Sequence, residues 1–159
     1  MTLFPYKKCI IPLSWNADEA EHILHCFTKD IKDRDLLEDT TGLQVYKFNG
    51  WVKDQKFKVS KKVKYPQNYM PIAVGIIEET SNGSIVEIEF QLFPATKQTI
   101  WFSFIATLIF ILIASIFKHN LTASLFILGL FLTYYIVVIA NFNMHIKDCI
   151  KALNEVWEN

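Results

Sequence analysis

The chain has 159 residues, a length that suits a single domain. Its 16 basic residues balance 16 acidic residues, so the net charge is zero, which excludes nucleic acid as a bulk electrostatic partner. The three cysteines, Cys9, Cys26 and Cys149, are odd in number and far apart, which argues against a disulfide framework and suits a reducing compartment.

The N-terminal part predicts a strand followed by a helix. Residues 7–15 predict a short strand and include Pro12, which places that strand at an edge or at a bulge. Asn16 can cap the following helix, and Glu19, three residues later, completes a capping box. The apolar stripe of this helix extends as far as Ile31, and a polar connector then covers residues 33–42.

Four strand-like runs come next, over residues 43–52, 56–65, 70–80 and 84–93. Short connections between them predict an antiparallel meander with one apolar and one wet face. The pair Asn82-Gly83 predicts a tight hairpin between the last two runs. The first helix is expected to cover the apolar face.

Two long uncharged runs follow this predicted sheet. Residues 98–117 are twenty residues without a charge, and residues 120–144 form a second such run. Twenty helical residues span about 30 Å, the thickness of the hydrocarbon core of a bilayer. A hairpin in a soluble protein would carry a polar stripe, and neither run has one. The runs therefore predict an antiparallel transmembrane hairpin.

Within this hairpin, small residues at a spacing of four predict close helix contact, at Ser103 and Thr107 and at Gly129 and Thr133. The lysines at the two ends of the hairpin predict its orientation. The loop end carries Lys118, whereas the end near the termini carries three lysines: Lys97, Lys147 and Lys151. By the positive-inside rule both termini lie in the cytoplasm.

The last segment, residues 142–159, predicts an amphipathic helix. Its polar face mixes acidic and basic residues, whereas a helix lying on a membrane surface favours basic ones. We therefore expect it to pack back on the sheet.

The predicted fold class is an α+β membrane protein. A small antiparallel β-sheet cytoplasmic domain (residues 1–97) is covered by amphipathic helices and joined to a two-helix transmembrane hairpin (98–141), with the C-terminal helix (142–159) returning to the sheet. The predicted location is the inner (plasma) membrane, with several membrane passes.

A spaced pattern in the sheet region resembles one found in uncharacterised small bacterial membrane proteins that place a β-rich module beside a two-helix transmembrane hairpin. The pattern consists of Phe48-x-Gly50-x-Val52, Phe57-x-Val59, Tyr65, Pro71-Ile72 and Gly75-x-Ile77. The resemblance covers about residues 43–117 and implies a bacterial inner-membrane origin, with no implication for activity.

The candidate site residues form a lysine row along the second strand-like run and its approach: Lys53, Lys56, Lys58, Lys61, Lys62 and Lys64. Three interpretations stay open. The row is a solvated strand face paired across the sheet with Glu87 and Glu89, a contact for anionic lipid headgroups, or a site for an anionic ligand such as a nucleotide.

Catalytic and metal-binding patterns are weak. His22, His25 and Cys26 lie close in sequence, but His25 points away from the other two on a helix, and zinc needs three or four converging ligands. The serines lack the Gly-x-Ser-x-Gly setting of a nucleophile, and the dispersed glycines form no phosphate-binding loop. We expect no metal, no cofactor and no catalytic activity.

The predicted function is a membrane-anchored cytoplasmic binding or scaffold module. The alternative is a membrane effector whose cytoplasmic domain senses a signal and whose hairpin oligomerises to disrupt the bilayer. A membrane-bound enzyme is the third hypothesis. Expected partners are the lipid bilayer and either a protein partner or further copies of the chain.

Overall fold

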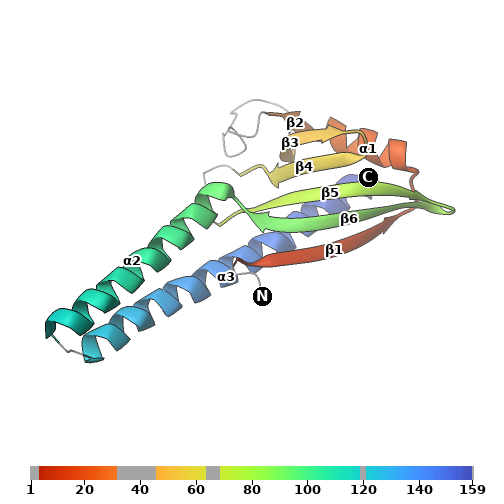
Figure 1. Ribbon diagram of the computed structural model, residues 1–159. Helices are drawn as coiled ribbons and strands as arrows, with labels where there is room; N and C mark the ends of the chain where they lie inside the picture. The colour runs from red at the N-terminus through yellow and green to blue at the C-terminus, as the bar shows by residue number, and fades with distance from the viewer. Residues whose placement is uncertain (1–3, 32–45, 64–68, 119–120, 159) are drawn as a thin grey trace.

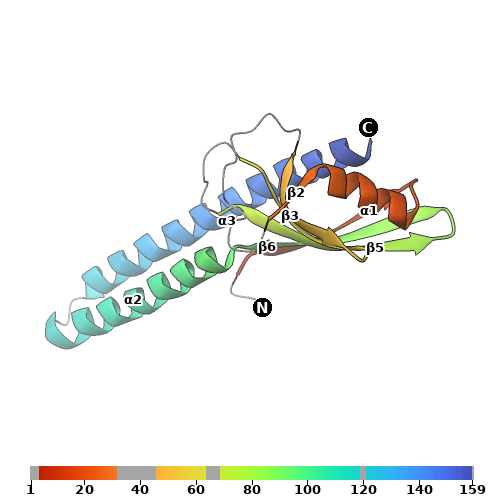
Figure 2. The same cartoon turned by 90° about the horizontal axis from the view of Figure 1, so that it is seen from above.

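The computed structural model describes residues 4–31, 46–63, 69–118 and 121–158 (Figures 1 and 2). In these ranges the elements are, in chain order, β1 (Tyr6–Leu13), α1 (Ala17–Cys26), β2 (Thr28–Asp30), β3 (Phe48–Lys53), β4 (Lys56–Lys61), β5 (Pro71–Thr80), β6 (Gly83–Leu92), α2 (Pro94–Lys118) and α3 (Leu121–Trp157).

The strands form one six-stranded sheet in the order β1-β6-β5-β4-β3-β2. The predicted meander from β3 to β6 is confirmed, since each of these neighbours pairs antiparallel. The edge position predicted from Pro12 is also confirmed, because β1 pairs only with β6. The β5–β6 hairpin is tight, but Ser81 and Asn82 form its loop, and Gly83 is already paired with Thr80.

The sequence missed β2, which pairs parallel to β3. It is three residues long and lies where the apolar stripe of the predicted helix was expected to continue. Helix α1 ends earlier, at Cys26, and Thr28 Oγ1 donates a hydrogen bond of 2.7 Å to the Leu24 carbonyl. The Ile31 amide then donates to the Gly50 carbonyl at 3.0 Å. The sheet is therefore mixed.

The capping box of α1 is confirmed. The Glu19 amide donates to Asn16 Oδ1 at 2.7 Å, and the Asn16 amide donates to Glu19 Oε2 at 3.4 Å. These bonds satisfy amides that have no partner within the helix and fix the turn out of β1. Helix α1 thereby lies over one face of the sheet, where Ala20 and Leu24 are fully buried.

The C-terminal half of α3 packs beside α1 on the same face of the sheet. Its apolar stripe is buried against the sheet, including Ile146, Cys149, Leu153 and Val156. Two indole groups fasten its end: Trp157 Nε1 donates to the Ala20 carbonyl at 3.2 Å, and Trp15 Nε1 donates to the Trp157 carbonyl at 2.9 Å. The C-terminal half of α3 therefore lies against the sheet.

Helix α2 and the N-terminal half of α3 lie side by side and project from the sheet as an arm (Figures 1 and 2). We call α2 together with residues 121–140 the apolar arm. Only 6% of the apolar window of α2 and 11% of that of α3 is buried. Both helices are long and apolar enough to cross a membrane, criteria that a core helix of a soluble protein also meets.

The predicted fold class is wrong in its architecture. Among the described residues the sheet has six strands rather than five, and one of its pairings is parallel. The hairpin and the C-terminal helix are not separate units, because α3 is one helix of 37 residues that runs through residues 141 and 142. The sequence changes polarity there without any residue that breaks a helix.

Candidate functional site

A groove of about 580 Å³ lies between α3 and the ends of β3 and β4 that face the apolar arm. We call it the lysine groove. Its lining residues are Tyr46, Lys47, Lys61, Lys62, Val63, Asp148, Lys151, Ala152 and Glu155. The lining contains four lysines, two carboxylates, the aromatic ring of a tyrosine and two small apolar side chains.

The pairing of β3 with β4 creates one wall of the groove. Because Phe48 is opposite Lys61, the residues that precede β3 meet those that follow β4. The Lys62 amide donates a hydrogen bond of 2.8 Å to the Lys47 carbonyl, which extends the pairing beyond the strands. This places three lysines, Lys47, Lys61 and Lys62, on one side.

Helix α3 supplies the other wall. Asp148, Lys151 and Glu155 follow one another at spacings of three and four, so they share one face of the helix. Cys149 and Leu153 lie on the adjoining face, and both are fully buried against the sheet. The packing of the apolar stripe thus fixes the direction in which the charged face points.

The charges in the groove are only partly compensated. Lys47 Nζ lies 3.3 Å from Glu155 Oε2 and 5.8 Å from the centre of the Phe27 ring. Lys61 and Lys151 form no ion pair with any residue in the described ranges. An exposed ion pair such as Lys47–Glu155 contributes about 0–1 kcal/mol, so an incoming anion can compete for Lys47 at little cost.

The predicted lysine row is divided by the structure. Lys61 and Lys62 line the groove, whereas Lys53 and Lys56 are opposite each other at the far end of the β3–β4 hairpin, about 17 Å away along β4. Lys58 lies between the two ends. Lys64 lies outside the described residues.

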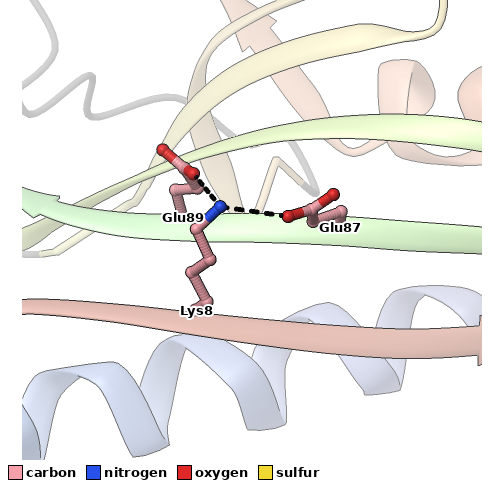
Figure 3. Close-up of polar contacts among 3 residues, drawn as sticks. All are labelled: Lys8, Glu87 and Glu89. Atoms are coloured by element: carbon pink, nitrogen blue, oxygen red, sulfur yellow. Dashed lines mark hydrogen bonds and ion pairs between the residues drawn. The ribbon is translucent and has the colours of Figure 1, made fainter.

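The expected pairing of the lysine row with Glu87 and Glu89 is wrong. Strand β5 separates β4 from β6, and the basic partner comes from β1 instead (Figure 3). Lys8 Nζ lies 2.6 Å from Glu89 Oε1 and 3.2 Å from Glu87 Oε1. The hydrogen bond from Lys8 lowers the pKa of Glu89, and the bond to Glu89 raises the pKa of Lys8. These contacts lie on the sheet face opposite α3.

The four residues predicted to pack the arm helices fall into two groups. Ser103 and Thr107 are half-buried, and Thr107 Oγ1 donates to the Ser103 carbonyl at 2.8 Å. Gly129 and Thr133 are exposed, and a Cβ at Gly129 would meet nothing within 4 Å. Gly129 therefore does not bring the two helices of one chain together.

The thiol and imidazole groups do not converge on a metal site. In the described ranges, no three His, Cys, Asp or Glu side chains are placed to hold an ion. Cys26 Sγ lies 3.8 Å from His22 Nε2 at the exposed surface of α1. Cys149, by contrast, is fully buried where α3 packs on the sheet, and this burial raises the pKa of its thiol to about 12.

Cys149 is therefore expected to resist alkylation in the folded protein at pH 8, while Cys26 reacts. Burial disfavours the thiolate, and a pKa of about 12 leaves roughly one thiol in ten thousand ionised at that pH. Mass spectrometry after timed exposure to iodoacetamide measures both rates in one sample. Unfolding the protein in a strong detergent should equalise them. Equal rates in the folded protein would contradict the burial of Cys149.

Comparisons with known proteins give a likeness to a solved structure. No family model matches the chain, and no curated protein matches it. The solution structure of the Polyketide_cyc-like protein Cgl2372 from Corynebacterium glutamicum is similar, with a TM-score of 0.42 and 9% sequence identity. The alignment covers 99% of this chain and 91% of that one.

The expected class, a membrane protein with a small antiparallel module beside a separate hairpin, is corrected by the parallel pairing of β2 with β3 and by the continuity of α3. The chain is an α+β fold in which a six-stranded mixed sheet packs against α1 and one end of the long helix α3. No activity follows from the likeness.

Proposed function

We propose that the chain is a membrane-attached binding module and that the lysine groove is its binding site. The observation that carries this proposal is the continuity of α3. One helix of 37 residues begins in the apolar arm and ends under the sheet, and the groove is built on its second half. Attachment and binding then belong to one rigid element.

The surface of the apolar arm supports its insertion in a bilayer. Large apolar side chains point outward over its whole length; those more than half exposed include Phe102, Ile109, Phe110, Leu112, Ile116, Phe126, Leu130 and Ile136. A soluble monomer rarely exposes so large a continuous apolar patch. The lysine distribution, with Lys97, Lys147 and Lys151 near the sheet end, favours a cytoplasmic position for the sheet and for both termini.

The chemistry of the groove supports binding rather than catalysis. Among its described lining residues, none is a serine, threonine, cysteine or histidine that could act as a nucleophile or as a base near neutral pH. Lysine ammonium groups and a phenol offer positive charge and hydrogen-bond donors to an anion. The effector hypothesis stays a prediction, because it depends on assembly of several chains.

Thermal unfolding of the full chain in mild detergent tests the binding site. A panel of anions (phosphate, pyrophosphate, citrate and a nucleotide) is added at matched ionic strength. We expect at least one of them to raise the melting temperature of the wild type, since a ligand that binds only the folded state stabilises it. The double variant Lys61→Glu/Lys151→Glu should lose this response.

The matched control is Lys53→Glu/Lys56→Glu, which makes the same change in charge at the far end of the β3–β4 hairpin. It should retain the full response. A response that both variants lose equally would show general charge attraction and contradict a site in the groove. No response of the wild type to any anion in the panel would also overturn the proposal.

A further inference from the structure

We propose that the ligand of the lysine groove is a single phosphate-bearing group. This inference rests on the proposed function, because it names the chemistry that the same groove recognises. A phosphate group that enters the groove is bound between Lys61 on the sheet side and Lys151 on the helix side.

The charge of the groove fits one phosphate group. Four lysines and two carboxylates line it, so its net charge is 4 − 2 = +2. A phosphate diester or monoester carries between one and two negative charges near neutral pH. A long polyanion would bring additional charges close to Asp148 and Glu155, which repel it. Lysine binds phosphate as a point charge and needs no fixed bidentate geometry.

Two lysines of the groove are available to bind a phosphate group. Lys61 and Lys151 have no ion-pair partner among the described residues, and Lys47 has only the exposed carboxylate of Glu155. A phosphate with several acceptor oxygens can contact Lys61 and Lys151 from opposite walls and leave the Lys47–Glu155 pair in place. Tyr46 adds a phenol to the lining of the groove.

The position of the groove along α3 places it just beyond the layer of lipid headgroups. Asn141 is the first residue beyond the apolar arm, and Asp148 and Lys151 follow it by seven and ten residues on α3, about 10 and 15 Å along the helix. The headgroup layer extends about 5–7 Å beyond the hydrocarbon core. The arrowhead of β4, which ends at Lys61, points to the side from which α2 departs (Figure 1). Phosphate can therefore come from a lipid headgroup or from solution.

Lysine labelling of the full chain in lipid nanodiscs tests the inference and separates the two sources. One nanodisc contains phosphatidylcholine alone, and a second contains equal parts of phosphatidylcholine and phosphatidylglycerol. A third sample is the phosphatidylcholine nanodisc with inorganic phosphate, with chloride balancing the ionic strength elsewhere. A brief pulse of an amine-reactive reagent is read out residue by residue with mass spectrometry.

We expect labelling of Lys61 and Lys151 to fall about fivefold, relative to phosphatidylcholine alone, in at least one of the two samples that carry phosphate without a balancing positive charge. A lysine near an anionic headgroup gains about 1 kcal/mol, which corresponds to this factor. Labelling of Lys53 and Lys56 should not change. Protection by phosphatidylglycerol alone identifies the headgroup as the source, protection by inorganic phosphate alone identifies the solute, and protection in both supports phosphate recognition from either source.

Two outcomes would overturn the inference. Equal protection of all four lysines would mean a diffuse surface charge effect, and no protection of Lys61 and Lys151 in either sample would mean that the groove does not bind phosphate. If citrate still stabilised the wild type but not Lys61→Glu/Lys151→Glu, the binding site would stand and only its assignment to phosphate would fail.

Discussion

Replacing Leu108 and Leu130 together by arginine is expected to remove the chain from the membrane fraction. Both side chains are at least half exposed, and they lie near the middle of the two helices of the apolar arm. An arginine at the centre of a membrane helix costs about 2.5–3.5 kcal/mol in insertion, and the lost leucines remove about 0.3–0.6 kcal/mol each. The double change therefore costs about 6–8 kcal/mol.

Extraction of cell membranes with alkaline carbonate measures this effect. The wild type should stay in the pellet, and the arginine variant should appear in the supernatant or be degraded. The matched control, Ile10→Arg/Ile76→Arg, alters two exposed isoleucines on the sheet and should stay in the pellet. If the wild type were released by carbonate, or if the arginine variant folded normally and stayed with the wild type in either fraction, membrane attachment through the arm would be wrong.

Local rules predicted much of the sheet correctly. The capping box at Asn16 and Glu19, the edge position of the strand with Pro12 and the hairpin before Gly83 each depend on residues that are close in sequence. Strand β2 could not be found in this way, because a three-residue strand has little pattern of its own. It exists through hydrogen bonds to β3, which begins 20 residues further along the chain than β2.

The division of the chain at residue 142 illustrates a second limit. The sequence becomes polar after Asn141, and polarity marks a change of surroundings rather than a break in the backbone. Helix α3 continues because nothing in that region stops it, and it passes from the exposed arm to the buried core near Phe142.

The lysine groove could not be predicted from the sequence, because it depends both on the pairing of strands and on the course of α3. Lysines at positions 61 and 62 were recognised as candidates, but the sequence grouped them with Lys53 and Lys56 because all lie on one strand or next to it. The register of β3 with β4 and the direction of α3 decide which of them meet Asp148 and Lys151. Lys8, and not the lysine row, is the ion-pair partner of Glu89. The sequence does not indicate this pairing, because β1 is about 80 residues away from β6 in the chain.

The contact between Gly75 and Phe57 is expected to be a sensitive point of the sheet. The two residues are opposite each other on β5 and β4, and a Cβ at Gly75 would clash with Phe57 Cζ and lie 2.8 Å from the Glu87 carbonyl oxygen. Gly75→Ala should destabilise the fold by about 1–3 kcal/mol through overpacking. Phe57→Ala should cost about 3–5 kcal/mol, because the ring is fully buried and leaves a cavity.

The two changes together should cost less than their sum. Removing the ring relieves the main clash of the new methyl group, whereas the contact with the Glu87 carbonyl stays, so the relief is partial. We expect a coupling energy of about 1–2 kcal/mol, within the range for residues in direct contact. Circular dichroism monitors the unfolding of the full chain in mild detergent. It gives the free energy of unfolding of the wild type, both single variants and the double variant.

Gly129→Ala is the matched control for the glycine replacement. A Cβ at that position meets nothing within 4 Å, and Ala favours a helix over Gly by about 1 kcal/mol, so this variant should be as stable as the wild type or more stable. If Gly75→Ala behaved like Gly129→Ala, or if the costs of Gly75→Ala and Phe57→Ala simply added, the Phe57 ring would not lie over Gly75. The packing of β4 against β5 would then be different, and with it the position of Lys61 in the lysine groove.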